Sequence, residues 1–188
     1  MANKHLLEKL AKPALFVAIG AAARLLPHPP NFAPIGAMAL FGGAHMEKRE
    51  ALILPLAAMV ISDLLIGFDS IPMRMTVYGS FLAIVFIGSL LKKSAKAPNV
   101  ASASLASSLL FFLTTNFAVW AQGNMYPKTA EGLASAYYYA IPFFRNTILG
   151  DLFFTGLFFG AYYLLLNAGH SKARLKILFL KVRNLKSP

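Results

Sequence analysis

The stretch that decides the fold runs from Ala101 to Trp120 and reads ASASLASSLLFFLTTNFAVW. It carries no charged side chain, and as a helix rising about 1.5 Å per residue it can cross the roughly 30 Å hydrocarbon core of a bilayer. Of all 188 residues, 57% are hydrophobic and only 13% are charged, and the mean hydropathy is +0.61. Soluble domains carry about a quarter charged residues. The sequence therefore predicts an all-α integral membrane protein.

Apolar segments recur on both sides of this stretch, and we expect six transmembrane helices in a single membrane domain covering residues 1–188. The predicted spans are approximately residues 13–26, 32–46, 51–68, 75–91, 101–120 and 146–166. The second is short and follows the proline-rich run from Pro27 to Pro34, which cannot form a regular helix because proline lacks a backbone donor and restricts its predecessor. That segment either spans fully or is re-entrant.

The basic residues predict the orientation. In a six-span arrangement, 14 of the 18 lysines and arginines fall on the side that holds both chain ends. Basic loops remain in the cytoplasm, so we expect a multi-pass protein of a bacterial-type inner membrane with both ends inside. Insertion into a lipid bilayer accounts for the net charge of +11, and no nucleic-acid partner is expected. The cytoplasmic set is Lys4, Lys9, Lys12, Lys48, Arg49, Lys92, Lys93, Lys96, Lys172, Arg174, Lys176, Lys181, Arg183 and Lys186.

The C-terminal residues 171–188 form a basic tail with apolar residues at helical spacing, among them Leu175, Leu178 and Val182. This pattern predicts an amphipathic helix lying on anionic lipid headgroups. Docking onto a cytoplasmic partner is the alternative interpretation.

Signatures of catalysis are missing from the sequence. There is no cysteine, no G-x-x-x-x-G-K-[ST] phosphate loop and no H-E-x-x-H zinc motif. We therefore expect a protein that is not an enzyme, that holds no cofactor or metal, and that cannot itself hydrolyse ATP through such a loop.

Three polar side chains lie at similar depth in the predicted spans. At about 1.5 Å per residue, Asp63 and Asp151 lie roughly 8 Å, and Asn116 roughly 6 Å, below the outer ends of their spans. Ionisable groups in a bilayer are costly and usually face a cavity, so we expect an outward-facing solute site. Alternatively, the aspartates form buried ion pairs that only fix the packing. The candidate partners are Arg24, Arg74 and Arg145.

The long segment between the fifth and sixth spans adds aromatic candidates. Thr129 suits a helix N-cap and Pro142 a helix stop, which predicts a short tyrosine-rich helix. It is either an aromatic belt at the headgroups or a lid over the solute. The predicted substrate-binding residues are Arg24, Asn31, Asp63, Asn116, Trp120, Tyr126, Tyr138, Arg145 and Asp151.

Small residues recur every four positions on the first span, at Ala14, Ala18 and Ala22. Further pairs of this kind occur on the second span, for example Ala39 and Gly43. Such faces let helices approach closely, either inside the bundle or at a docking surface for another membrane subunit.

The chain resembles the S components, the substrate-binding membrane subunits of energy-coupling factor transporters, and a group of uncharacterised transport proteins close to them. The resemblance rests on the length, the six predicted spans and the Ala14-x-x-x-Ala18-x-x-x-Ala22 pattern. It also rests on RLLPHPPNFAPIGAMALFGGA (24–44), ISDLLIGF (61–68) and TNFAVWAQGNMYPKTAEGL (115–133).

This resemblance implies an S-component-like bundle that binds a vitamin or similar small nutrient from outside. A transmembrane coupling subunit with ATPase subunits would then drive its release inside. Ala14, Ala18 and Ala22 would meet that coupling subunit. Two other functions remain open: a stand-alone carrier or channel that uses Asp63 and Asp151, and a structural membrane protein without a ligand.

Overall fold

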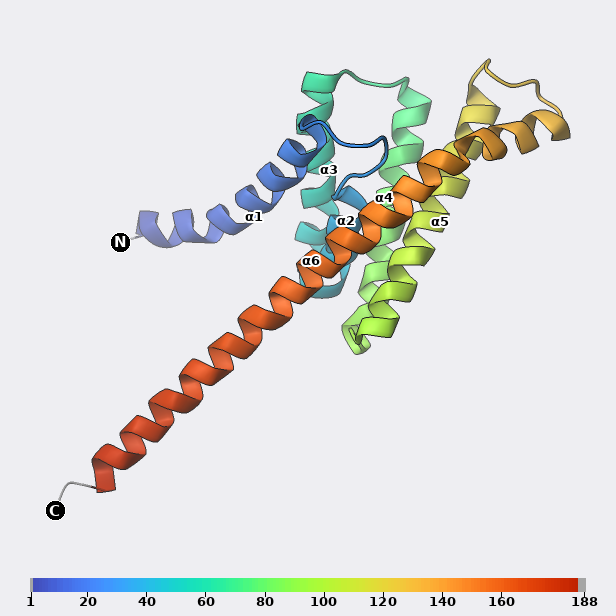
Figure 1. The fold of residues 1–188 in the computed structure, drawn as a ribbon. Coiled ribbons are helices and arrows are strands. Elements are labelled where there is room, and N and C mark those ends of the chain that lie inside the picture. Colours follow the sequence, from blue (N-terminus) through green and yellow to red (C-terminus); the bar gives the residue numbers. More distant parts are fainter. Residues whose placement is uncertain (1, 186–188) are drawn as a thin grey trace.

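The computed structural model describes the backbone of residues 2–185 and the side chains of residues 14–166 (Figure 1). Over this range the chain is all-helical, as predicted. The helices are α1 (Ala2–Leu25), α2 (Ile35–His45), α3 (Lys48–Ile66), α4 (Ile71–Leu90), α5 (Ala97–Gln122) and α6 (Ala130–Leu185), with a short 3-10 turn at Leu91–Lys93.

Three helical segments of the described chain are long and apolar enough to cross a membrane. They are Ile71–Lys93, Ala97–Gln122 and Ala130–Leu166, while Ala14–Leu25 and Ile35–His45 are shorter apolar helices. α3 begins with Lys48, Arg49 and Glu50 and also carries Asp63, so its apolar run is interrupted. The protein thus has the helices of a membrane protein, and three of the six predicted spans are both long enough and apolar enough to cross a bilayer.

Helix α2 is the centre of the bundle. It packs against α3, α4, α5 and α6, and nearly every one of its residues is buried. Its 11 residues reach only about 16 Å, roughly half of a hydrocarbon core. The preceding residues 26–34 are not helical and descend into the bundle before α2 begins (Figure 1). The predicted second span is therefore a half-length helix behind an irregular segment, rather than one continuous helix.

Two glycines allow α2 to approach α4. A Cβ added at Gly43 would collide with the backbone carbonyl of Val85, and one added at Gly88 would collide with that of Leu40. Gly43 therefore serves packing inside the bundle, which was one of the two interpretations of the small residues on this segment.

Helix α1 packs on α3 and leaves one face uncovered. Gly20 lies against the side chains of Met38 and Ala58. The predicted docking residues Ala14, Ala18 and Ala22 lie on the exposed face of α1 in the described chain.

The predicted helix stop at Pro142 is wrong. Thr129 caps the start of α6 as expected, because its Oγ1 accepts a hydrogen bond from the backbone N–H of Gly132 at 3.2 Å. The helix then runs through Pro142 without ending. Contacts with α5 hold both sides of the proline: the Tyr137 hydroxyl donates to the carbonyl of Leu113 at 2.9 Å, and the rings of Phe144 and Phe112 stack.

The basic tail continues α6 as a helix to Leu185 rather than forming a separate one. Residues 186–188 and the side chains of the tail lie outside the described part of the chain, so its role at the headgroups stays a prediction.

The α2–α4 contact leads to a testable prediction. Gly88→Ala should lower the free energy of unfolding by about 1–3 kcal/mol, as expected for an added methyl group in a tightly packed site. The measurement is thermal unfolding in detergent. Gly79→Ala on the same helix is the matched control, because a Cβ there would meet nothing within 4 Å. Equal effects of the two substitutions would contradict the assigned contact.

Candidate functional site

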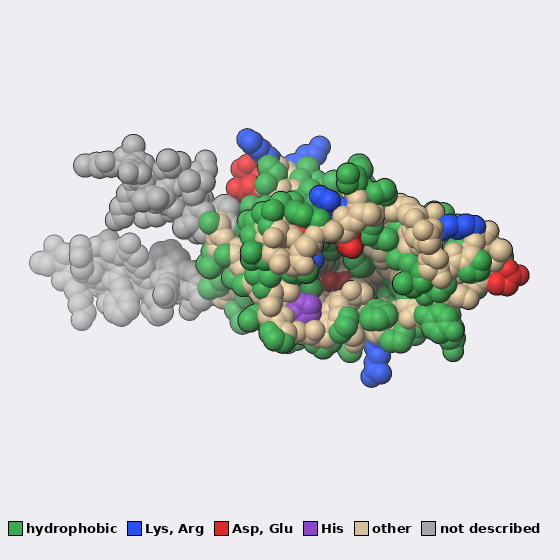
Figure 2. All heavy atoms as spheres, turned by 90° about the horizontal axis from the view of Figure 1, so that it is seen from above, with side chains coloured by type: hydrophobic (Ala, Val, Ile, Leu, Met, Phe, Trp, Pro, Cys, Tyr) green, Lys and Arg blue, Asp and Glu red, His purple; other side chains and the backbone are tan. Residues whose placement is uncertain are grey.

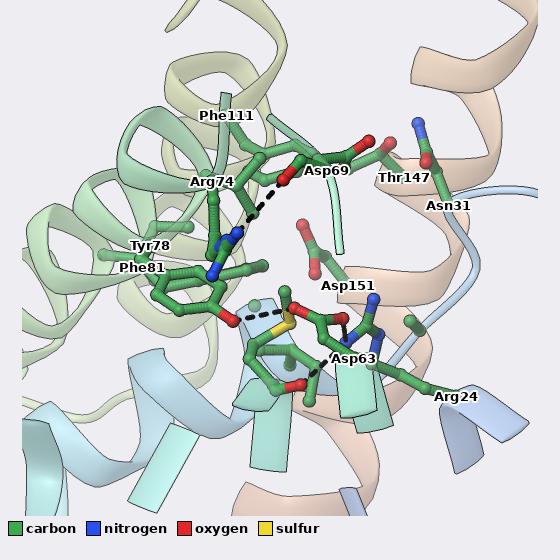
Figure 3. Close-up of a pocket in the computed structure, with 16 residues that line it drawn as sticks. Arg24, Asn31, Asp63, Asp69, Arg74, Tyr78, Phe81, Phe111, Thr147 and Asp151 are labelled. Carbon is green, nitrogen blue, oxygen red and sulfur yellow. Dashed lines mark hydrogen bonds and ion pairs between the residues drawn. The ribbon is translucent and has the colours of Figure 1, made fainter. Parts of the chain in front are cut away.

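A cavity of about 230 Å³ lies at the N-terminal end of α2. We call the end of the bundle that carries the α3–α4 and α5–α6 connections the cavity end (Figure 1). Viewed from that end, charged side chains are visible in a central hollow surrounded by hydrophobic ones (Figure 2). Its charged walls are Arg24, Asp63, Asp69, Arg74 and Asp151, contributed by α1, α3, the α3–α4 connection, α4 and α6 (Figure 3).

An ion pair closes one side of the cavity. Arg24 Nη1 lies 2.7 Å from Asp63 Oδ1 and also donates to the hydroxyl of Ser62. The Tyr78 hydroxyl donates to the other oxygen, Asp63 Oδ2, at 2.7 Å. Both oxygens of Asp63 are thus engaged, and the group ties α1, α3 and α4 together. For Asp63 the structure thus shows the ion pair with an arginine that was the alternative to a binding role.

Asp151 is different. It is only 6% exposed, and its Oδ2 accepts a hydrogen bond from Ser108 at 2.7 Å. In the described part of the chain, Oδ1 accepts none and no arginine or lysine pairs with this carboxylate. Oδ1 fills the position that a Cβ of Gly36 would occupy, so the first turn of α2 needs a glycine here. The predicted pairing of Asp151 with an arginine is not present in the described residues.

Arg74 faces the cavity from α4. Its Nη2 donates to the backbone carbonyl of Asp69 at 3.2 Å, and its guanidinium lies 4.3 Å from the centre of the Phe68 ring. Its Nε is buried without a hydrogen-bond partner, an uncommon state for a charged group. Arg74 therefore has no carboxylate partner among the described side chains.

A second space of about 330 Å³ adjoins the cavity toward the cavity end. The two share Asn31, Asp69, Val77, Phe111 and Thr147 as walls. The second is mainly apolar and aromatic, and we call it the aromatic groove. Its rings are Phe111, Phe112, Phe143 and Phe144. A charged inner cavity and an aromatic groove together suit a ligand with a polar head and a flat apolar part.

The predicted site residues divide into three groups. Arg24, Asn31, Asp63 and Asp151 line the cavity, and Asn31 has a positive φ of 64° that asparagine tolerates. Asn116 lines the aromatic groove, where its amide donates to the carbonyl of Phe112 at 2.8 Å. The residues that line neither space are Trp120, Tyr126, Tyr138 and Arg145.

Trp120 contacts the α5–α6 connection and not the cavity. Its Nε1 donates to the carbonyl of Pro127 at 2.9 Å, and Lys128 donates to the carbonyl of Trp120 itself, so the ring anchors the α5–α6 connection. Tyr138 is 68% exposed. Neither ring covers the cavity in this conformation, and a lid role for them stays a prediction.

Sequence reasoning did not assign Gly36, Tyr78 or Ser108 to the site. Ser108 belongs to a row of buried hydroxyls between α5 and α6, with Ser104 and Thr155 below it. In the sequence, Ser104, Ser107 and Ser108 fall within five positions of an apolar stretch, and this spacing indicates a polar helix face. Such hydroxyls commonly hold membrane helices together, which is why the row alone does not mark a ligand site.

The ion pair leads to a second prediction. Asp63→Asn should strand the charge of Arg24 and lower the free energy of unfolding by about 3 kcal/mol, the lower end for buried pairs, since the Arg24 side chain is 20% exposed. Asp69→Asn is the control, because Asp69 is exposed and forms no ion pair in the described part. Thermal unfolding of both variants measures the difference. A stable Asp63→Asn protein would show that this pair does not fix the packing.

Comparison with known proteins places the chain in a family without assigning an activity. No curated protein and no solved structure matches it significantly. One family model, described as a family of unknown function (DUF6580), matches residues 4–174. Because that match covers nearly the whole sequence, the chain belongs to the DUF6580 family.

Proposed function

We propose that the protein is a membrane substrate-binding subunit for the uptake of a small, vitamin-like nutrient. The observation that carries this proposal is the cavity at the start of α2, where a buried carboxylate, Asp151, has an oxygen without a donor. Unpaired ionisable groups are costly in a membrane, and a ligand that supplies the missing partner offsets the cost. The aromatic groove beside it adds the apolar surface that small-molecule sites commonly have.

The proposal includes a six-crossing topology with both ends in the cytoplasm. The α3–α4 and α5–α6 connections lie at one end of the bundle, and the α2–α3 and α4–α5 connections lie at the other (Figure 1). The second crossing would consist of the irregular segment 26–34 and then α2. Irregular backbone at membrane depth is tolerated where it lines a cavity, and Asn31 and Ala33 do so. The cavity end would face outward.

Release of the solute inside would depend on partner subunits, namely a transmembrane coupling subunit and ATPases. The exposed stripe of Ala14, Ala18 and Ala22 on α1 is the proposed contact with the coupling subunit. The surrounding bilayer would be an inner, cytoplasmic membrane of the bacterial type.

A stand-alone carrier that couples to a cation is the second candidate. The unpaired Oδ1 of Asp151 favours it, because a lone buried carboxylate can hold a cation. Asp63 does not, since Arg24 and Tyr78 occupy both of its oxygens.

Topology is testable with single cysteines, because the natural chain has none. Lys128→Cys should react with a membrane-impermeant thiol reagent in intact cells. Lys48→Cys and Lys93→Cys, which are also exposed, should react only after permeabilisation. Labelling of position 93 in intact cells would rule out the six-crossing arrangement.

Uptake and binding separate the two candidate functions. Native mass spectrometry of gently purified protein should show a bound solute together with partner subunits. Ala18→Leu should abolish uptake in cells while the purified protein still binds the solute, because the added bulk blocks close helix approach away from the cavity. The matched control is Ala106→Leu, an exposed alanine on α5.

Uptake into liposomes by this chain alone would favour the carrier instead. Loss of solute binding and of folding together in Ala18→Leu would assign the stripe to internal packing.

A further inference from the structure

The charges around the cavity are of two kinds, those already paired and those left without a partner. Arg24 and Asp63 neutralise each other at 2.7 Å, and the Tyr78 hydroxyl occupies the remaining oxygen. This group contributes no net charge, and each carboxylate oxygen of Asp63 already accepts a hydrogen bond. A solute therefore meets a wall there that is electrostatically neutral.

Of the three remaining charges, Asp69 is exposed to solvent, and the two that are more buried, Arg74 and Asp151, are of opposite sign. Asp151 Oδ1 accepts no hydrogen bond in the described part of the chain, and the carboxylate is only 6% exposed. The Arg74 guanidinium donates to one backbone carbonyl through Nη2, while its Nε is buried without a partner. Neither side chain has an oppositely charged side chain within ion-pair distance among the described residues.

Both charges line the same cavity of about 230 Å³, Arg74 from α4 and Asp151 from α6. They approach it from different sides and do not touch each other (Figure 3). A ligand with a single charge would pair with one of them and leave the other buried without a partner, which is unfavourable. A ligand that carries both charges would pair with both at once.

The apolar part of the ligand follows from the neighbouring space. The aromatic groove, about 330 Å³, shares the ring of Phe111 with the cavity and adds Phe112 and Phe144, which stack on each other with centroids 4.3 Å apart. Flat rings bind well against such surfaces. A solute whose charged head fills the cavity would place its apolar end here.

We propose that the solute is an aromatic zwitterion whose protonated amine binds Asp151 and whose anionic group binds Arg74, with its ring in the aromatic groove. This inference rests on the proposed function, since it names the class of solute for the same cavity. It leaves open which partner subunits the protein uses.

Three probes of nearly equal shape test the proposal. They are tryptophan, which carries both charges, tryptamine, which lacks the carboxylate, and indole-3-propionate, which lacks the amine. Titration calorimetry on the purified protein should give tryptophan an affinity at least tenfold higher than either of the others.

Two variants then locate the charges. Asp151→Asn should abolish the preference for tryptophan over indole-3-propionate and keep the preference over tryptamine. Arg74→Gln should do the reverse. The controls are Glu131→Gln and Arg145→Gln, which line neither space and should keep both preferences.

The order of the three affinities on the unmodified protein tests the zwitterion proposal even if a variant fails to fold. Tryptamine or indole-3-propionate binding as tightly as tryptophan, or no binding of any probe, would overturn the zwitterion. Native mass spectrometry separates this from failure of the proposed function. A copurified solute of single charge would overturn only the zwitterion, whereas a protein with no solute and no role in uptake would overturn both.

Discussion

The half-length of α2 is the constraint on which the rest of the structure depends. A helix of 11 residues in the centre of the bundle leaves roughly half of the central column unfilled by helix. That space becomes the cavity, and the surrounding helices must line it. Close packing of Gly43 against α4 holds α2 at this depth, so a contact far from the cavity sets where the cavity begins.

Polar groups around the cavity follow from this arrangement. In a bilayer, backbone and charged groups need internal partners. Arg24, Asp63 and Tyr78 satisfy one another across α1, α3 and α4. These contacts stabilise the cavity wall at a level of the bundle where α2 is absent. The same wall is therefore structural, although its residues face the cavity. Asp151 lacks such a set of partners, and this difference separates a packing aspartate from the aspartate proposed to bind the solute in the same cavity.

The sequence predicted the all-helical fold and placed Asp63 and Asp151 at similar positions in their helices, because both depend on local length and on a constant helical rise. Each lies five residues inside its predicted span, Asp63 from residue 68 and Asp151 from residue 146, and both line one cavity. The position of Trp120, Tyr138 and Arg145 could not be obtained in this way. For Tyr138 and Arg145 it depends on whether α6 breaks at Pro142, and the contacts of Tyr137 and Phe144 with α5 decide that point. For Trp120, on α5, it depends on the hydrogen bond to the carbonyl of Pro127. Which acid pairs with Arg24 is likewise a tertiary property that no spacing encodes.

In the six-span arrangement, the predicted outer side holds four basic and four acidic residues, so charge counting along the sequence gives no sign for the solute. The structure changes the meaning of that balance, because it shows which charges cancel directly. Arg24 and Asp63 cancel across 2.7 Å, whereas Arg74 and Asp151 remain apart on different helices. Buried charges of opposite sign that are held apart on different helices polarise the cavity, and in a medium of low dielectric constant such a field favours a ligand dipole over a single ion. The proposed zwitterion follows from this polarisation, because a molecule whose own charges are separated in the matching order can pair with both Arg74 and Asp151.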